Sequence, residues 1–191
     1  MKSVLTSSAF ALLASTAIAD TITLYTSQPN ADAQRTVDAF MAANPGTEVD
    51  WVRDGTTKLM ARLRAEIEAG NPQPDVLLIA DTVTLEGMAQ QGLLNAYSSP
   101  EAENYDAALF SPKGFYDSTK LITTGLVYNT GVETAPTSWG DLSDASIKGQ
   151  IAMPSPLYSG AALIHLATLT SDDSLGWDYY EGLAANGARA Q

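Results

Sequence analysis

The stretch IAMPSPLYSGAALIHLATL, residues 151–169, places hydroxyl groups and a glycine where an extended run meets a helix-like run. Pro154 and Pro156 end the extended run, because proline cannot donate a hydrogen bond to a strand ladder. Ser159 is a good helix N-cap, and Gly160 lets a small molecule approach the first free amide groups closely. Such a helix start attracts anions, because its unpaired N–H groups and its dipole point outward. Anion binding by hydroxyl and amide groups is therefore the first chemistry that the sequence suggests.

Three further junctions between extended and helix-like runs offer the same kinds of groups. In open α/β sheets, ligands bind outside the carboxyl ends of the strands, so we expect all four junctions to share one pocket on one rim. Arg53 and Lys58 flank the second junction, although pairing with neighbours such as Asp54 is the alternative to a ligand role. The residues expected to line the pocket are Thr26, Ser27, Gln28, Gly55, Thr56, Thr57, Asp81, Thr82, Ser155, Ser159, Gly160 and Ala161.

Catalytic and metal-binding alternatives have few residues available. The chain has no Cys and one His, which excludes a Cys nucleophile or a multi-His zinc site within it. A secreted hydrolase would use Ser159 as its nucleophile, but LYSGA lacks the glycine that a nucleophile elbow prefers before the serine. The one candidate base, His165, follows six residues later on the same predicted helix. Tyr179 and Tyr180 suggest a metal-ligand pair, whereas inward packing of one ring on an amphipathic helix is the simpler interpretation.

The composition indicates a globular, acidic and exported chain. Of 191 residues, 45% are hydrophobic and 17% are charged, so a packed core is expected, and with no Cys it must form without disulfides. Residues 1–19 predict a secretory signal peptide, with Lys2 before a mostly apolar or small run and Ala17-Ile18-Ala19 at the cleavage site. Cleavage removes one of the 10 basic residues and none of the 22 acidic ones, so the net charge changes from −12 to −13. This charge argues against nucleic acid and anionic membrane surfaces as partners.

Hydrophobic periodicity predicts the elements that must hold the junctions in place. Extended runs at 21–27, 47–55 and 74–81 alternate with helix-like runs, which is typical of a parallel sheet in an α/β fold. The run at 74–81 is continuously apolar, so we expect a central strand buried on both faces. The helices should bury two apolar stripes, formed by Val37, Phe40 and Met41 and by Leu59, Leu63 and Ile67.

The second half of the chain is less regular. Residues 95–120 are rich in loop formers, and their scattered aromatic residues are expected to cover the core. LITTGLVYNTG, residues 121–131, has a strand pattern through Leu126, Val127 and Tyr128. Residues 135–156 predict a turn, a short helix capped by Ser138 and another strand, and a final helix should run to Gly187.

Several of these motifs resemble periplasmic solute-binding proteins of ABC transporters. The resemblance includes LYTSQPNADAQRTVDAFMAANPG, VRDGTTKLMARL and PDVLLIADTVTLEGMAQQGLL, and its most specific part is SWGDL followed by KGQIAMPSP. It implies an α/β, type II periplasmic binding-protein fold in which two lobes close over a ligand. Residues 20–128 would form the first lobe without its C-terminal return segment, and residues 129–191 would form part of the second. Members of this group are usually longer, so the chain is expected to end inside the second lobe.

The resemblance also implies a function without catalysis or a cofactor. The group contains binders of ferric iron, phosphonates and phosphorylated sugars. It implies a periplasmic monomer that captures a small anionic solute between its lobes, such as a phosphonate or organophosphate, and delivers it to the permease of an ABC importer.

Ferric ion is the alternative cargo that the resemblance offers. Iron-binding members hold the metal with a His in the first loop, an acid after the third strand and an adjacent Tyr pair late in the second lobe. Here the first loop reads Ser27-Gln28-Pro29-Asn30, without a His, and Asp81 stands near the place of the acid. Tyr179-Tyr180 comes earlier than the iron-binding pair. The sequence therefore favours an organic anion over ferric ion.

Overall fold

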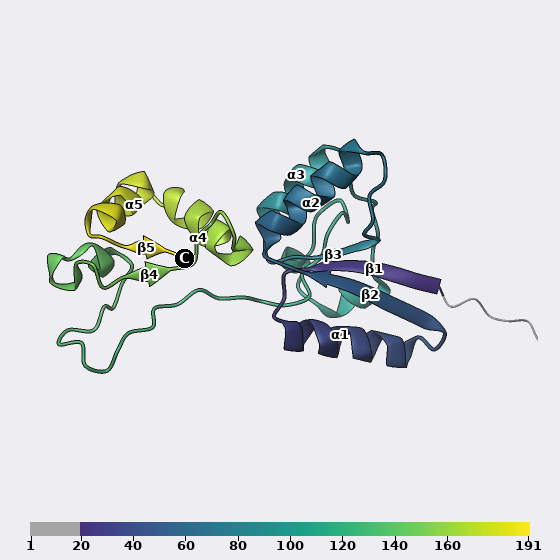
Figure 1. The fold of residues 1–191 in the computed structure, drawn as a ribbon, viewed down its shortest axis with the longest axis horizontal. Coiled ribbons are helices and arrows are strands. Elements are labelled where there is room, and N and C mark those ends of the chain that lie inside the picture. Colours follow the sequence, from purple (N-terminus) through teal and green to yellow (C-terminus); the bar gives the residue numbers. More distant parts are fainter. Residues whose placement is uncertain (1–19) are drawn as a thin grey trace, which may run out of the picture.

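The computed structural model describes residues 20–191, so the predicted signal peptide at 1–19 lies outside the described residues. Within the described part, the elements gather into two units joined by an extended segment (Figure 1). We call the unit around strands β1 (Asp20–Thr26), β2 (Thr47–Arg53) and β3 (Val76–Leu78) the N-terminal lobe. The unit around strands β4 (Ala152–Met153) and β5 (Arg189–Ala190) is the C-terminal lobe. No helix between residues 20 and 191 is long and apolar enough to cross a membrane.

The N-terminal lobe is a parallel three-stranded sheet with helices on both faces. Its strand order is β2-β1-β3, and both pairings are parallel. Helix α1 lies against one face, and α2 and α3 lie on the other (Figure 1). The chain thus crosses first to one side of β1 and then to the other, which makes the carboxyl ends of β1 and β3 a topological switch point. The elements are β1 (Asp20–Thr26), α1 (Asn30–Ala43), β2 (Thr47–Arg53), α2 (Thr56–Glu68), β3 (Val76–Leu78) and α3 (Thr82–Gln90).

The core of this lobe lies between β1 and α2. Tyr25 is fully buried and packs against Leu59, Met60 and Leu63 of α2. The stripe expected on this helix is therefore confirmed for Leu59 and Leu63, which are spaced by one helical turn. Burying these apolar side chains supplies the main force that fixes α2, and with it the junction at residue 55, against the sheet.

Two expectations for the N-terminal lobe are wrong. The apolar run at 74–81 forms only the short strand β3, which lies at an edge of the sheet and leaves Val76 47% exposed. Strand β1 takes the central place, because β2 and β3 both pair with it. Phe40 is 42% exposed, and the buried residues of α1 are Ala33 and Val37, so the buried stripe lies nearer the start of the helix than predicted.

The middle of the chain folds back onto the N-terminal lobe and then leaves it. Tyr97 N–H donates to the Gly114 carbonyl at 2.8 Å, and the Tyr116 hydroxyl donates to Glu86 of α3 at 2.8 Å. Residues 121–131, predicted as a strand, do not form one: no described residue offers a ladder to them, and Val127 is 99% exposed. They form the extended link between the lobes in Figure 1. The short 3-10 helices of this region are η1 (Pro100–Asn104) and η2 (Ala107–Leu109).

The C-terminal lobe is a small parallel strand pair with helices packed beside it. Its core cluster joins Leu169, Tyr179 and Leu183, with Trp139 and Met153 packed against them. The final predicted helix is confirmed and ends before Gly187, whose positive φ of 76° suits a glycine. The elements are η3 (Gly140–Ser143), η4 (Ala145–Ile147), β4 (Ala152–Met153), α4 (Gly160–Thr170), α5 (Gly176–Ala185) and β5 (Arg189–Ala190).

Candidate functional site

The first corner, after β1, uses most of its polar groups to hold the ends of two strands together. The buried Thr26 hydroxyl donates to the Leu78 carbonyl of β3 at 3.0 Å and accepts from the Gln28 N–H at 3.2 Å. The Ser27 hydroxyl accepts from the Ala80 N–H at 3.0 Å. The Gln28 side chain differs, because its Oε1 is buried without a hydrogen-bond partner among the described residues. The first corner is therefore rigid, and Gln28 is its free polar group.

The second and third corners each carry one buried oxygen without a partner. Thr56, the first residue of α2, is 3% exposed, and its Oγ1 has no hydrogen bond within residues 20–191. Asp81 is 2% exposed and caps α3, because its Oδ1 accepts from the Thr84 N–H at 2.6 Å. Its Oδ2 is also without a partner in the described part of the chain. Buried polar atoms are nearly always hydrogen-bonded, so these two oxygens are candidates for contact with a bound group.

The fourth corner brings the C-terminal lobe against these two oxygens. A Cβ atom built on Gly160 would lie 2.6 Å from Thr56 Oγ1 and 3.2 Å from Asp81 Oδ2. Gly160 is needed here for space, since any larger residue would collide with Thr56. Ser159 caps α4 as expected, because its hydroxyl accepts from the Ala162 N–H at 3.3 Å. The start of α4 therefore faces the second and third corners directly.

A cavity of about 280 Å³ opens beside this meeting point. It lies at the switch point between β1 and β3, where open α/β sheets bind their ligands. Ile164 of α4 closes one part of it, so both lobes contribute to its wall. The predicted residues that line the cavity are Ser27, Gln28, Asp81 and Thr82, and the polar residues that were not predicted are Tyr116, Asp117, Ser118, Thr119 and Lys120.

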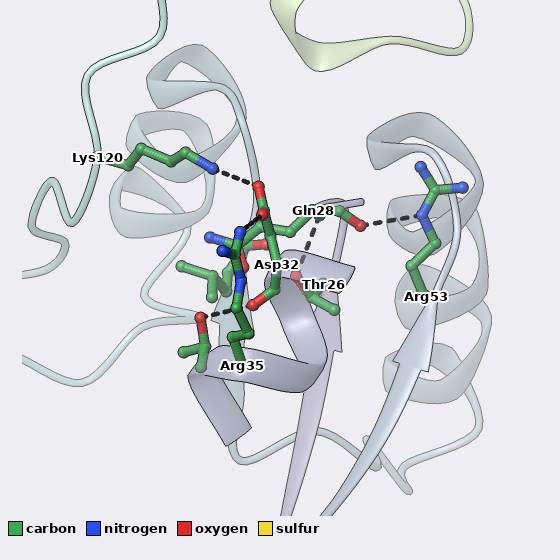
Figure 2. A network of polar contacts seen from close by, with 8 residues as sticks. Thr26, Gln28, Asp32, Arg35, Arg53 and Lys120 are labelled. Carbon is green, nitrogen blue, oxygen red and sulfur yellow. Dashed lines mark hydrogen bonds and ion pairs between the residues drawn. The ribbon is translucent and has the colours of Figure 1, made fainter. Parts of the chain in front are cut away.

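Positive charge gathers around the first two corners despite the acidic composition. Figure 2 shows the side chain of Arg53 on one side of Gln28 and those of Asp32, Arg35 and Lys120 on the other. Arg53 Nε donates to the Gln28 carbonyl at 3.0 Å, and Lys120 Nζ lies 2.7 Å from Asp32 Oδ2. Hydrogen bonds from Lys120 and then from Arg35 lower the pKa of Asp32. One carboxylate thus faces two cations, and the cavity wall itself carries Lys120 together with two acids, Asp81 and Asp117.

Several expected residues lie apart from this cavity. Thr57 is exposed on the surface of α2, and the Ser155 hydroxyl accepts locally from the Leu157 N–H at 3.2 Å. Gly55 is buried under the ring of Tyr158, and Ala161 lines a separate apolar hollow in the C-terminal lobe. The structure therefore brings together Thr56, Asp81 and Gly160, with Ser27, Gln28 and Thr82 on the adjacent cavity wall.

The residues of the catalytic and metal alternatives also lie elsewhere. His165 Nδ1 is 3.0 Å from the Tyr180 hydroxyl, and burial lowers the pKa of this histidine. Burial, with a smaller contribution from Tyr179, raises the pKa of Tyr180 to about 12. Tyr179 is 5% exposed in the core of the C-terminal lobe. In the described residues, Ser159 therefore has no general base beside it, and no three His, Asp or Glu residues form a metal-binding group.

Lys120, Tyr116 and Tyr158 were missed as site residues for identifiable reasons. Lys120 and Tyr116 lie in the irregular segment, where no periodicity fixes which side chains turn toward the sheet. Tyr158 stands next to the predicted Ser159, but its contact with the other lobe depends on how the lobes meet. The charge of Lys120, one of only 10 basic residues in an acidic chain, was the one available signal.

Residues 25–188 match the family described as bacterial extracellular solute-binding protein, so the chain belongs to this family. The family consists of transport proteins that bind solutes, which confirms the expectation that the chain is not an enzyme. One relative is a probable ABC transporter periplasmic-binding protein of Sinorhizobium fredii. It is 27% identical over 190 residues, which cover 92% of this chain and 52% of the relative. The predicted resemblance is therefore confirmed.

A second relative and a solved structure extend the comparison. A putative 2-aminoethylphosphonate-binding periplasmic protein of Salmonella typhimurium is 33% identical over 161 residues, 78% of this chain and 43% of the relative. The structure of the periplasmic binding protein AfuA of Actinobacillus pleuropneumoniae is similar with a TM-score of 0.71 and 24% identity, over 90% of this chain and 57% of AfuA. The α/β, type II fold is therefore confirmed. The chain spans about half the length of the curated relatives that it matches.

Proposed function

We propose that the chain is the solute-capturing part of a periplasmic binding protein that serves an ABC importer, and that its solute is a small organic anion of the phosphonate or organophosphate class. The observation that carries the proposal is the meeting of Thr56, Asp81 and Gly160 beside the cavity. Three segments far apart in the sequence bring buried oxygens and a helix start to one place. The names of both relatives, which describe periplasmic binding proteins, support this class of function.

Groups suited to an anion lie at or near the cavity, which Asp81 and Asp117 also line. The start of α4 offers free amide groups and the positive end of its dipole. Lys120 lines the cavity wall, and Arg53 is fixed beside Gln28 by its bond to the carbonyl oxygen. A small oxyanion held by these groups needs no full neutralisation by side chains, because amide dipoles share the charge.

Asp81 adds a second requirement on the solute. A carboxylate oxygen can only accept hydrogen bonds, so Oδ2 would repel a solute made of acceptors alone. A solute that also carries an ammonium group would satisfy this oxygen and form a charge-assisted hydrogen bond. The Salmonella relative is named for 2-aminoethylphosphonate, which combines a phosphonate with an ammonium group. We therefore propose an amino-substituted anion, and 2-aminoethylphosphonate is the first probe.

Calorimetric titration of residues 20–191 with 2-aminoethylphosphonate, ethylphosphonate and ferric citrate tests the proposal. We expect 2-aminoethylphosphonate to bind at one site and ethylphosphonate, which lacks the amine, to bind at least about tenfold more weakly, since a hydrogen bond to a charged group contributes roughly 1.5–3 kcal/mol. If ethylphosphonate bound as tightly as 2-aminoethylphosphonate, the proposed need for an ammonium group that faces Asp81 would be wrong. The absence of heat from both phosphonates would overturn the anion proposal.

Ferric ion is the less favoured cargo on geometric grounds. Asp81 is the one acidic residue of the proposed iron set that lies at the cavity, whereas Tyr179 and Tyr180 lie on α5 in the C-terminal lobe. The Tyr180 hydroxyl is also already in hydrogen-bond contact with His165 Nδ1. A ferric site would need hard oxygen ligands to converge, and these do not. If ferric citrate gave heat and neither phosphonate did, the result would favour iron over the organic anion as the cargo.

The remaining parts of the proposal concern location and partners. We propose that residues 1–19 direct export to the periplasm and that the chain acts there as a monomer which delivers its solute to a permease. Expression of the 191-residue chain in a Gram-negative host, followed by fractionation, should place a product beginning at Asp20 in the periplasm. A cytoplasmic product that retains residues 1–19 would contradict the export step.

A further inference from the structure

Tyr158 of the C-terminal lobe lies against the β2–α2 corner of the N-terminal lobe. It lies in the turn just before α4, where the Tyr158 and Ser159 N–H groups both donate to the Ser155 carbonyl, at 3.0 and 2.8 Å. This turn fixes the backbone next to Gly160 without help from the other lobe. The ring of Tyr158 then projects across the gap between the lobes onto Gly55.

Gly55 leaves the space that the ring of Tyr158 occupies. A Cβ built on Gly55 would lie 2.5 Å from Tyr158 Cε2 and 2.7 Å from both Cδ2 and Cζ, closer than atoms can approach. The backbone of Gly55 has φ −62° and ψ 147°, which any residue can adopt. A side chain at position 55 would therefore displace the ring of Tyr158 from its present place, although the backbone conformation would accept one.

Two cations from the same corner hold the edge and face of the ring. Lys58 Nζ lies 5.5 Å from the ring centroid, within the range of a cation–π interaction. Arg53 Nη1 lies 3.5 Å from the Tyr158 hydroxyl. Gly55, Lys58 and Arg53 thus all belong to one short segment of the N-terminal lobe, residues 53–58. All three contact the side chain of Tyr158 in the C-terminal lobe.

We propose that Tyr158 is a latch that docks the C-terminal lobe on Gly55 and holds the lobes closed before any solute binds. The contact lies beside Thr56 and Gly160, so docking of the ring brings α4 to the proposed site. A binding protein whose closed form is already populated loses less affinity to the closing step. The effect on solute affinity rests on the proposed function, whereas the effect on closure does not require a solute.

The chain offers a direct way to measure this contact. Because it contains no Cys, two introduced cysteines, Glu68→Cys on α2 and Asp173→Cys before α5, are unique sites for spin labels on exposed positions of the two lobes. Pulsed electron resonance then gives the distribution of distances between the lobes in the solute-free protein. The protein that carries only these two labelled cysteines should show one dominant distance between the labels, which is that of the closed form.

Four variants in this background decide the proposal. Gly55→Ala and Tyr158→Ala should each lower the ratio of closed to open protein by about fivefold to tenfold, since loss of a cation–π contact and its packing has this size. Tyr158→Phe should keep most of the closed form, because the ring and Lys58 remain. Gly87→Ala is the matched control, since a Cβ there meets nothing within 4 Å, and it should leave the distances unchanged.

The two disruptive variants lie in different lobes, so a local folding defect in one lobe cannot explain a shared result. Thermal unfolding of each variant verifies that both lobes remain folded. An unchanged distance distribution in both Gly55→Ala and Tyr158→Ala would overturn the latch. Changed distances together with no heat from any phosphonate would refute the proposed solute and leave the latch supported.

Discussion

Asp81 uses its two carboxylate oxygens for different purposes. Oδ1 caps α3, and Oδ2 is buried beside Gly160 without a partner among the described residues. A residue that served only as a cap would gain nothing from burying its second oxygen, because an unpaired buried polar atom costs free energy. The proposed contact between this second oxygen and an ammonium group of the solute would supply the missing partner.

Asp81→Asn should change which solutes bind without unfolding the protein. Asparagine is as good an N-cap as aspartate, so α3 is retained. The affinity for 2-aminoethylphosphonate should fall by at least about tenfold, because the charge-assisted hydrogen bond is lost, whereas ethylphosphonate should bind more tightly since the repelling charge is gone. Calorimetric titration of Asp81→Asn and of the parent with both phosphonates measures the change. Equal weakening of both phosphonates would show that Asp81 supports the site only structurally.

Asp141 provides a test of electrostatics far from the proposed site. Its carboxylate accepts from the N–H groups of Thr137 at 2.7 Å and Ser138 at 3.0 Å and from both hydroxyls, and these bonds, with Thr137 N–H first, lower the pKa of Asp141 to about 2. A lowered folded-state pKa means that the stabilisation is present above the unfolded value near 3.9 and is lost as the pH falls through about 2.

Asp141→Asn should therefore destabilise the protein at pH 7, and the difference from the parent should narrow as the pH falls from about 4 toward 2. Urea unfolding midpoints at a series of pH values measure this difference. Asp173→Asn, a change at an exposed acid of the same lobe, is the control. A difference that stays constant down to pH 2 would show that the ionised carboxylate does not supply the stabilisation.

At the scale of elements, helices were easier to predict than strands. The stripe of Leu59 and Leu63 and the Ser159 cap are local patterns, and both are present. The strands failed at 121–131 and in the placing of 74–81, because a strand depends on the neighbours that pair with it. The rim of the sheet could be predicted from βα alternation, but the place of Lys120 beside it depends on the fold of an irregular segment.

The start of α4 can be tested as an element. Ser159→Ala removes the hydroxyl that accepts from Ala162 N–H, so unfolding should become easier by about 1 kcal/mol. Ser159→Thr keeps a hydroxyl cap and should lose much less. Chemical unfolding of the three proteins measures the difference. Equal stability of Ser159→Ala and the parent would mean that contact with the N-terminal lobe, and not the cap, holds the start of α4.

At the scale of the whole molecule, the two lobes meet through a small number of side chains. Gly160 approaches Thr56 and Asp81, Tyr158 covers Gly55, and Ile164 closes part of the cavity. Such a small contact can open and close, which is what a binding protein that captures and releases a solute requires. Because the net charge is −12, the general field disfavours anions, and local donors must offset it at the proposed site.

The convergence of the corners can be measured directly by nuclear magnetic resonance. Backbone amide shifts of the 15N-labelled chain, residues 20–191, are recorded while 2-aminoethylphosphonate is added. The signals of residues 27–28, 56, 81–82 and 160–161 should move together with a single saturation curve, although these segments are far apart in the sequence. Shifts confined to one of these segments, or none at saturating solute, would contradict a common pocket formed by both lobes.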